Sequence, residues 1–379
     1  MSVGIVASSA DAATFQTLHS FGNGSDGANP DGKLAMDSAG ILYGVTAVGG
    51  AFSGGTVYSL DPVSRALTTL YSFTNGADGG HPQTGITLDA KGNLYGVAAT
   101  GGSTVNCSQG CGTVFRLNVA SKKLTTLHTF TGLADGYMPE GALLLVGKTL
   151  YGTTYLGGTG ANCGVTGCGT LFKFVPSTKA FTTVHELVVP DGANPIARLV
   201  RAKSGLLYGT ATSGGTIGSG TVFSFNPTTN AFATLHSFDN QVDGSDADAD
   251  LMIDGGFIYG TMAVGPTTAG YGTIYELDPA TGKLTTLYSF KAKADGAYPG
   301  YGVVLGPSGW LYGTAPGGDF NAGVVFKFNP GTLAFKPIHQ FATSDGSFPS
   351  GSLLNRGGAL YGVTRSGGNG YGTVFKIIP

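Results

Sequence analysis

The stretch Gly92-Asn-Leu-Tyr-Gly96 carries a Leu-Tyr-Gly core that returns along the whole chain. Leu-Tyr-Gly or Ile-Tyr-Gly occurs seven times, centred on Tyr43, Tyr95, Tyr151, Tyr208, Tyr259, Tyr312 and Tyr361. The steps between these tyrosines are 52, 56, 57, 51, 53 and 49 residues. A period of about fifty residues that persists from end to end indicates a repeat architecture.

Each unit contains four short runs of similar character. In the third unit they are Gly141–Val146, Thr149–Tyr155, Gly169–Phe174 and Ala180–Leu187. The runs are rich in Val, Thr, Tyr and Phe and are bounded by Gly, Asn, Asp and Pro, which is typical of strands separated by turns. We therefore predict four antiparallel strands per unit, A to D, and no helical segment. Seven such units predict an all-β fold, a seven-bladed β-propeller.

The two ends of the chain indicate how the ring closes. The chain begins with a D-type run, Phe15–Phe21, that has no A, B or C run before it. It ends with a C-type run, Gly372–Ile378, that has no D run after it. We predict that the N-terminal strand pairs into the last blade and completes it. Closure of this kind removes most exposed sheet edges.

The composition limits the classes of function. Charged residues make up 11% of the 379-residue chain, against about 25% in typical globular proteins. The net charge of −2 excludes the broad basic surface expected of a nucleic-acid-binding protein. The chain has no run of about 18 apolar residues, so we expect no transmembrane segment.

The N-terminal residues 1–13 differ from the repeats. They read MSVGIVASSADAA, are mostly small and apolar, and contain no Lys or Arg. We interpret them as a flexible leader or as the remnant of a signal peptide. Residues 14–379 are then expected to form one propeller domain.

The text of the repeats resembles that of the GloVer family, choice-of-anchor tandem repeats found in exported bacterial proteins. The matching segments include GTVYSLDP (55–62), LTTLYSF (67–73) and GNLYG (92–96), with Asp-Gly at 78–79 between them. The resemblance extends from about Phe15 to Ile378. It implies export, and thus a secreted, periplasmic or cell-surface location, and it implies no known reaction. We find no counterpart of the family's anchor tail after the last predicted blade.

Residues that every blade repeats are expected to be architectural. Five histidines occupy one position of strand D, where Tyr71 and Tyr288 take the other two places; they are His19, His128, His185, His236 and His339. Spread around a ring, they cannot converge on one metal, so we interpret them as structural hydrogen-bonding residues. An Asp-Gly pair follows each strand D, at Asp26, Asp78, Asp135, Asp191, Asp243, Asp295 and Asp345. We interpret these pairs as turns.

The four cysteines fall in two neighbouring B–C loops. Cys107 and Cys111 belong to blade 2, and Cys163 and Cys168 to blade 3. Two pairs in separate loops favour two local disulfides, which require an oxidising compartment. A four-cysteine zinc site is the alternative, although neither pair has the C-x₂-C form typical of such sites.

Residues that differ from blade to blade are the better candidates for function. We expect the D–A crossovers and the B–C loops on one face, around the mouth of the central channel. One crossover position reads Asn29, His81, Met138, Asn194, Asp246, Tyr298 and Phe348, and the start of the inner strand reads Asp31 and Lys33, Gln83, Glu140, Arg198, Asp248 and Asp250, and Tyr301. The predicted ligand-binding set is Asn29, His81, Glu140, Asn194, Arg198, Asp246, Asp248, Asp250, Tyr298, Tyr301 and Phe348.

Blade 5 departs most from the pattern, because residues 243–250 read DGSDADAD and lack the usual proline. Alternation along the strand places Asp246, Asp248 and Asp250 on one side. Three interpretations stay open. The run is a solvated polar rim, a calcium site formed by these three carboxylates, or the source of a general acid or base.

Three functions follow from these features. The first is a non-enzymatic recognition module at the cell surface or outside the cell, with a glycan as the expected partner, since aromatic faces stack on sugars and carboxyl and amide groups bind hydroxyls. The second is a propeller-type polysaccharide lyase or glycoside hydrolase, with Glu140, Asp248 or His81 as acid or base and Arg198 orienting an acidic sugar. The third is a structural protein of a surface layer or filament. Calcium is the one cofactor considered, and no phosphate loop, H-E-x-x-H or G-x-S-x-G motif is present.

Overall fold

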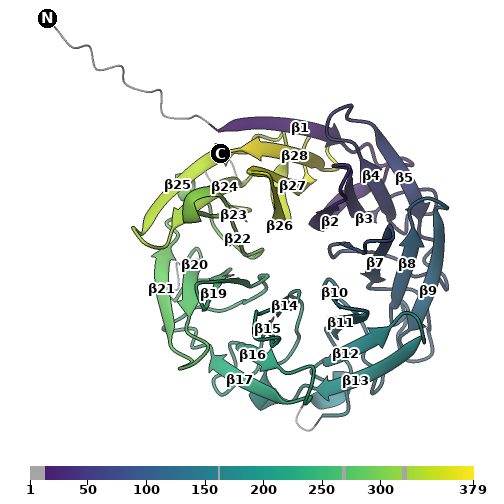
Figure 1. Cartoon of the computed structure of the whole chain (residues 1–379), viewed down its shortest axis with the longest axis horizontal. Coiled ribbons are helices and arrows are strands. Elements are labelled where there is room, and N and C mark those ends of the chain that lie inside the picture. Colours follow the sequence, from purple (N-terminus) through teal and green to yellow (C-terminus); the bar gives the residue numbers. More distant parts are fainter. Residues whose placement is uncertain (1–12, 161–162, 267–269, 318–321) are drawn as a thin grey trace, which may run out of the picture.

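The chain forms a ring of seven four-stranded antiparallel sheets around a central opening (Figure 1). The computed structural model describes residues 13–160, 163–266, 270–317 and 322–379. The predicted fold, an all-β propeller of seven blades, is confirmed. The predicted leader lies outside the described residues except for Ala13. None of the helical turns in the described ranges is long and apolar enough to cross a membrane.

Blades 1 to 6 each use four consecutive strands, in chain order from the inside outward. Blade 1 contains β2 (Ala28–Met36), β3 (Leu42–Val48), β4 (Thr56–Leu60) and β5 (Leu67–Ser72); blade 2 contains β6 (Thr87–Leu88), β7 (Asn93–Ala98), β8 (Thr113–Asn118) and β9 (Lys123–Thr129); blade 3 contains β10 (Leu144–Val146), β11 (Thr149–Thr154), β12 (Thr170–Val175) and β13 (Ala180–Glu186). Blade 4 contains β14 (Val200–Arg201), β15 (Leu207–Ala211), β16 (Thr221–Phe225) and β17 (Phe232–Ser237); blade 5 contains β18 (Met252–Asp254), β19 (Phe257–Met262), β20 (Thr273–Leu277) and β21 (Leu284–Ser289). Blade 6 contains β22 (Val303–Leu305), β23 (Leu311–Ala315), β24 (Val324–Asn329) and β25 (Ala334–Gln340).

Blade 7 shows how the ring closes. It contains β26 (Ser347–Arg356), β27 (Ala359–Ser366) and β28 (Thr373–Ile378), and its outer strand is β1 (Thr14–Ser20) from the start of the chain. Strands β1 and β28 are antiparallel, with Gln16 opposite Lys376 and Thr17 opposite Phe375. Figure 1 shows β1 outside β28 at the point where the first and last blades meet. The predicted closure is therefore confirmed.

The inner strand of blade 3 is shorter than the sequence predicts. In blade 3 the expected run Gly141–Val146 is a strand only over Leu144–Val146, whereas the other three strands agree within one residue at each end. The preceding residues leave the ladder, and the isolated bridge Tyr137 to Leu156 and a bond from the N–H of Tyr155 to the carbonyl of Met138 join the crossover to the residues that follow β11. In β2 the same region stays paired but shifts register between Asp31 and Ala35. These unpaired residues are the ones that border the central channel.

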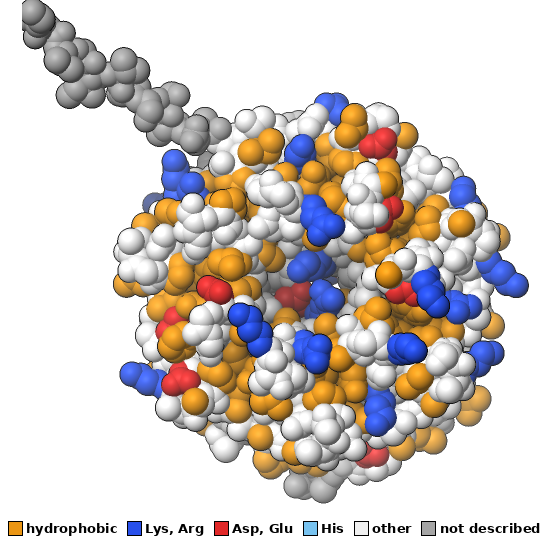
Figure 2. All heavy atoms as spheres, viewed as in Figure 1, with side chains coloured by type: hydrophobic (Ala, Val, Ile, Leu, Met, Phe, Trp, Pro, Cys, Tyr) orange, Lys and Arg blue, Asp and Glu red, His pale blue; other side chains and the backbone are white. Residues whose placement is uncertain are grey.

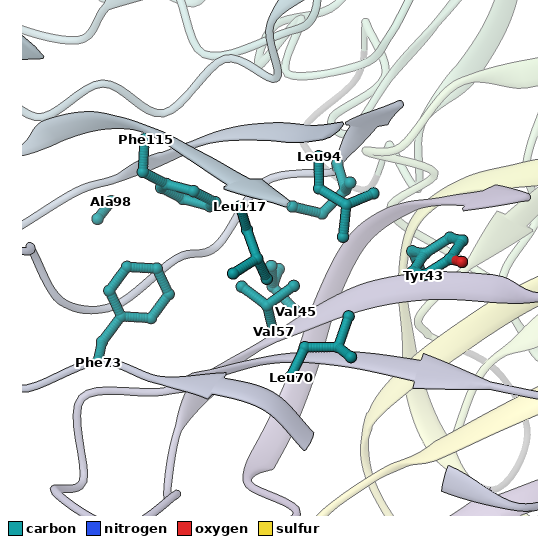
Figure 3. Close-up of a cluster of buried hydrophobic side chains, with 10 residues drawn as sticks. Tyr43, Val45, Val57, Leu70, Phe73, Leu94, Ala98, Phe115 and Leu117 are labelled. Carbon is teal, nitrogen blue, oxygen red and sulfur yellow. The ribbon is translucent and has the colours of Figure 1, made fainter. Parts of the chain in front are cut away.

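The hydrophobic core lies between the blades. Clusters of buried side chains fill each of the seven blade interfaces, including the interface between blades 7 and 1. Figure 3 shows the cluster between blades 1 and 2, where Val57 and Phe73 of blade 1 lie near Phe115 and Leu117 of blade 2. The rings of Phe73 and Phe115 meet edge to face with centroids 5.1 Å apart. Because each blade buries its faces against two neighbours, stability depends on a closed ring.

The glycine of Leu-Tyr-Gly has a packing role. Gly96 lies opposite Phe115 on the neighbouring strand, and a Cβ added to Gly96 would meet Cζ of Phe115 at 2.5 Å. The same cross-strand pair of glycine and aromatic ring recurs in every blade, as Gly44–Tyr58, Gly96–Phe115, Gly152–Phe172, Gly209–Phe223, Gly260–Tyr275, Gly313–Phe326 and Gly362–Phe375. The absent side chain makes room for the ring.

The repeated His, Tyr and Asp residues are structural, as predicted. In each blade the His or Tyr of strand D contacts the Asp of the following Asp-Gly turn. Nε2 of His185 lies 2.8 Å from Oδ2 of Asp191, and the hydroxyl of Tyr71 donates to Asp78 at 3.0 Å. The remaining pairs are His19–Asp26, His128–Asp135, His236–Asp243, Tyr288–Asp295 and His339–Asp345. Each pair ties the outer strand to its own crossover turn.

Both predicted disulfides are present. Cys107 bonds to Cys111 with the Cα atoms 5.2 Å apart, and Cys163 bonds to Cys168 with the Cα atoms 5.1 Å apart. The alternative of a four-cysteine zinc site is therefore wrong, because all four thiols are oxidised.

Candidate functional site

The seven crossovers share one backbone conformation. The residue at the variable crossover position has a left-handed φ between 52° and 61° in every blade, at Asn29, His81, Met138, Asn194, Asp246, Tyr298 and Phe348. In six blades its N–H donates to a carbonyl in the B–C loop of the preceding blade, as from Met138 to Cys111. Asp246 is the exception among the described hydrogen bonds. The backbone at this position is thus set by blade docking, which leaves the side chain free to vary.

A cavity of about 380 Å³ lies in the central channel, just below these crossovers. All seven blades contribute to its wall, and Figure 2 shows the ring hollowed at its centre with basic and acidic side chains inside. The polar and aromatic lining residues are Asp31, Lys33, Gln83, Thr84, Glu140, Arg198, Asp248, Asp250, Tyr298, Tyr301, Ser352 and Arg365.

The lining has two levels along each inner strand. The first residue after the crossover proline, or after Ala247 in blade 5, gives Asp31, Gln83, Glu140 and Asp248. The third residue gives Lys33, Arg198, Asp250 and Ser352. The two levels lie at alternate positions of the chain, and the residue between them has a left-handed φ in blades 1 and 7, at Gly32 and Gly351. The first level is the mouth of the cavity, since it is nearest to the crossovers.

The second level of lining residues separates two cavities in the channel. Lys33, Arg198, Asp250 and Ser352 also line a second cavity of about 230 Å³. The other walls of that second cavity come from residues farther along the inner strands, among them Val200, Met252 and Val304. We call these four residues the channel belt, because they form the floor of the larger cavity.

Asp250 holds the belt together. Its Oδ1 accepts the backbone N–H of Arg198 at 2.9 Å, and its Oδ2 accepts the hydroxyl of Ser352 at 2.6 Å. These bonds join blade 5 to blades 4 and 7 across the channel. The Asp250 carboxylate also stabilises the charged form of Lys33 in blade 1. Both oxygens of Asp250 are thus already used in tying blades together.

Asp31 and Arg365 form an ion pair at the wall. Asp31 is buried, and its Oδ2 accepts from Nε of Arg365 at 3.0 Å and from a terminal nitrogen of the same guanidinium. Its Oδ1 accepts the N–H of Gly32 at 2.8 Å. Burial raises the pKa of the Asp31 carboxyl, and Arg365 opposes that rise. The pair joins blade 1 to blade 7 and, together with Gly32, occupies both oxygens of Asp31, while the side chain of Arg365 is 45% exposed.

Glu140 and Asp248 are the free carboxyls of the mouth. Neither side chain forms a hydrogen bond or ion pair with the described residues. Burial, followed by repulsion from Asp246, raises the pKa of Asp248 to about 6. Burial raises the pKa of Glu140 as well, with repulsion from Asp248 and Asp31 adding to it and Arg365 opposing it. Both carboxyls can therefore accept hydrogen bonds from a ligand.

Lys33 and Arg198 are the free cations of the floor. Neither side chain forms an ion pair or a hydrogen bond within the described ranges. Nε of Arg198 is buried without an acceptor. Burial lowers the pKa of Lys33; attraction to Asp250 opposes this effect, and repulsion from Arg198 adds to it. A buried donor without an acceptor costs about 1–3 kcal/mol, so the floor favours an anionic group.

The structure brings together about half of the predicted ligand-binding residues. Glu140, Arg198, Asp248, Asp250, Tyr298 and Tyr301 line the cavity. Asn29, His81, Asn194, Asp246 and Phe348 lie outside its lining. Asn29 and Asn194 donate to the backbone carbonyls of Arg365 and Tyr155, and Nδ1 of His81 lies 2.9 Å from the hydroxyl of Thr100. Asp246 and Phe348 are exposed.

The three aspartates considered as one interpretation for a calcium site do not lie together. Among the described residues, no group of three or more His, Cys, Asp or Glu side chains is placed to hold a metal ion. Asp246 is exposed, whereas Asp248 lines the mouth and Asp250 is bonded into the channel belt. Asp246, Asp248 and Asp250 therefore lie in three different environments, although they are regularly spaced in the sequence.

Arg365 is the main residue absent from the predicted set. It lies at the end of β27, where the other blades have Ala47, Ala99, Tyr155, Thr212, Ala263 and Pro316. Ala263 and Pro316 line the cavity from this same position. A comparison of blades at the ends of the B strands, and not only at the crossovers, would have shown Arg365 as a blade-specific charge facing the channel.

Comparison with known proteins agrees with the repeat pattern. A family model described as the Gloeobacter/Verrucomicrobia repeat matches residues 3–166, 104–266 and 158–375, which together span almost the whole chain. No curated protein sequence matches the chain.

Solved structures share the fold at low sequence identity. The extracellular domain of a proposed one-component system from B. thetaiotaomicron has a TM-score of 0.60 and 10% identity, over 95% of this chain and 40% of that one. An oligogalacturonate lyase in complex with manganese has a TM-score of 0.56 and 12% identity, over 96% of this chain and 93% of that one. A proposed 6-phosphogluconolactonase from Bacteroides uniformis has a TM-score of 0.55 and 16% identity, over 81% of this chain and 84% of that one. The chain spans less than half of the first of these structures, and such likeness shows the fold alone.

Proposed function

The chain belongs to the Gloeobacter/Verrucomicrobia repeat family, and from that premise we propose that it is an exported, non-enzymatic recognition module that binds a glycan in the cavity at the mouth of its channel. The observation that carries the proposal is the wall of that cavity. Every blade contributes to it, and its side chains are those that differ from blade to blade. A concave surface that gathers blade-specific side chains on a repeated scaffold is typical of a binding site.

The chemistry of the wall favours a sugar. Tyr298 and Tyr301 provide aromatic surface, while Gln83, Glu140 and Asp248 provide acceptors and a donor for hydroxyl groups. Tyr298 is 48% exposed at the cavity edge, so one face is open to a ligand. A volume of about 380 Å³ is at the lower end of the range for small-molecule sites. It suits the terminal residue or two of a chain better than a long polymer segment.

The disulfides support export. Cys107–Cys111 and Cys163–Cys168 each close a short loop on the crossover face, and such bonds persist in oxidising compartments. The similar propeller from B. thetaiotaomicron is itself described as an extracellular domain. These observations support our proposal that the protein works in the periplasm, at the cell surface or outside the cell.

A pair of matched variants tests the binding site. Tyr298 and Phe348 occupy the same crossover position, with φ of 60° and 54° and exposures of 48% and 50%, but only Tyr298 lines the cavity. In calorimetric titrations against a panel of oligosaccharides, Tyr298→Ala should weaken binding by at least about fivefold, the equivalent of one lost stacking contact. Phe348→Ala should weaken it much less. Equal losses in both variants, or no bound sugar in a broad panel, would remove the proposal.

A polysaccharide lyase or glycoside hydrolase is the second candidate. Glu140 and Asp248 favour it, because the pKa values of both carboxyls are raised and both lie free in one cavity with Arg198. Carboxyls with pKa values near the working pH are suited to general acid or base catalysis. Cleavage of a polysaccharide by the wild type that is lost in both Glu140→Gln and Asp248→Asn would establish this activity. Binding without cleavage would leave recognition as the function.

A further inference from the structure

We propose that the ligand is an acidic sugar, and that its carboxylate reaches the floor of the cavity between Lys33 and Arg198 while its hydroxyls bond Glu140 and Asp248 at the mouth. The inference rests on the proposed function, since it assigns the chemical class and the orientation of the glycan at the same site. It follows from how the charges are divided between the two levels of the wall.

The first step concerns which charges are available. Of the seven charged side chains that line the cavity, Asp31 and Arg365 neutralise each other, and Asp250 is held by Arg198 N–H and Ser352. Four remain without a hydrogen bond within the described chain, namely Lys33, Glu140, Arg198 and Asp248. These four are therefore the groups that a ligand must satisfy.

The second step concerns where they lie. Lys33 and Arg198 belong to the channel belt and also border the smaller cavity, whereas Glu140 and Asp248 border only the larger one. The available cations are thus at the floor and the available carboxyls at the mouth. A ligand that meets both levels needs an anionic group at one end and hydroxyl donors at the other.

The third step concerns the energy of the floor. Lys33 and Arg198 repel each other, and Asp250 compensates for only part of their charge. An unpaired guanidinium Nε in a buried position is expensive. A carboxylate placed between the two cations would accept from both, and charge-assisted bonds of this kind are about twice as strong as neutral ones. A neutral sugar would leave Arg198 unpaired.

The opposite orientation and a cationic ligand fit less well. A carboxylate left at the mouth would face Glu140 and Asp248, which are already raised in pKa by burial and by neighbouring negative charge. An ammonium group would be accepted at the mouth but would leave the two cations of the floor without a partner. The acidic sugar with its carboxylate inward is the arrangement that satisfies both levels.

The test compares a disaccharide of uronic acids with the corresponding neutral disaccharide by calorimetric titration of the full chain. The wild type should bind the uronate at least about tenfold more tightly. Arg198→Gln should remove at least about tenfold of the uronate affinity, as expected for a lost charge-assisted bond, and leave the neutral sugar unaffected. Lys33→Gln should act in the same direction.

Arg201 provides the matched control. It ends β14 (Val200–Arg201), three positions after Arg198 in the chain, and is exposed outside both cavities. Arg201→Gln carries the same change of charge and should leave uronate binding unchanged. Melting temperatures of the three variants identify any variant that fails to fold. In that case the wild type is titrated with the uronate and with the neutral disaccharide at low and at high salt, and these two affinities replace the data from the unfolded variant.

The outcomes separate the two proposals. If neutral and acidic disaccharides bind equally, or if Arg198→Gln weakens both to the same extent, the acidic-sugar inference is overturned while glycan recognition stands. If an equal loss appears in Arg201→Gln, the effect is one of overall charge and the inference is again overturned. If no member of either series binds, glycan recognition itself fails.

Discussion

At the scale of single residues, Asp248 is the clearest case of a side chain whose environment disfavours its charged form. Its carboxyl is half-buried in the channel wall, has no hydrogen bond from the described residues, and has its pKa raised to about 6 by burial and by Asp246. Glu140 and Tyr301 also lie on that wall. Residues placed in this way usually serve a ligand and reduce the stability of the fold.

The pH dependence of stability follows from this shift. Because the pKa of Asp248 is higher in the folded chain than the usual 3.8, the folded state binds the proton more tightly. Asp248 therefore costs stability as the pH rises from about 4 to about 6, and the cost is constant above that range. Asp248→Asn should be more stable than the wild type at pH 7 by about 1–2 kcal/mol, after screening by solvent in the cavity, and equal to it near pH 4.

Denaturant unfolding at the two pH values measures this difference. Asp254→Asn, on an exposed end of β18, provides the comparison and should change the free energy of unfolding by less than about 0.5 kcal/mol at either pH. A destabilising effect of Asp248→Asn at pH 7 would mean that the carboxylate is paired in the folded state, contrary to the account given above.

At the scale of the element, each blade is organised by the pair of a glycine on strand B and an aromatic ring on strand C. Gly96→Ala places a methyl group against the ring of Phe115, which also packs on Phe73 across the blade interface. We expect a loss of about 1–3 kcal/mol, the usual cost of overpacking. In a double-mutant cycle with Phe115→Leu, the two losses should be less than additive, because the smaller side chain relieves the clash. Additive losses would show that the glycine serves some other purpose.

The sequence predicted the strands and turns of the blades more fully than it predicted the residues of the channel. Repetition makes Leu-Tyr-Gly, the His or Tyr of strand D and the Asp-Gly turn recognisable as scaffold, and their contacts agree with that assignment. The residues of the channel were harder to assign. Alternation predicted one common side for Asp246, Asp248 and Asp250, but these residues precede β18 and lie outside its ladder, and each has a different environment.

Long-range contacts account for the rest. Ser352 reaches Asp250 over 102 residues of sequence, and Arg365 reaches Asp31 over 334. No local pattern specifies such pairs, because they depend on how seven blades are spaced around the axis. The division of charges into a mouth and a floor therefore required the structure.

At the scale of the whole molecule, the site exists only because the ring closes. Strand β1 contributes Leu18 to the core between blades 7 and 1, and Phe21 follows it into the same cluster. Deletion of residues 1–21 would uncover β28 as an edge and remove two buried side chains, each contributing about 1.5–3 kcal/mol. We expect the truncated chain to lose cooperative thermal unfolding, and a peptide spanning residues 13–21 to restore it in trans by strand addition. Retention of the wild-type melting temperature by the truncated chain would contradict this role of β1.

The most direct measurement is a crystal structure of the full chain with a uronic-acid disaccharide bound. The account predicts one sugar in the central cavity, with its carboxylate within hydrogen-bond distance of the Arg198 guanidinium and with hydroxyls on Glu140 and Asp248. A sugar bound on the outer edges of the blades, or one seated in the channel with its carboxylate toward the crossovers, would contradict it.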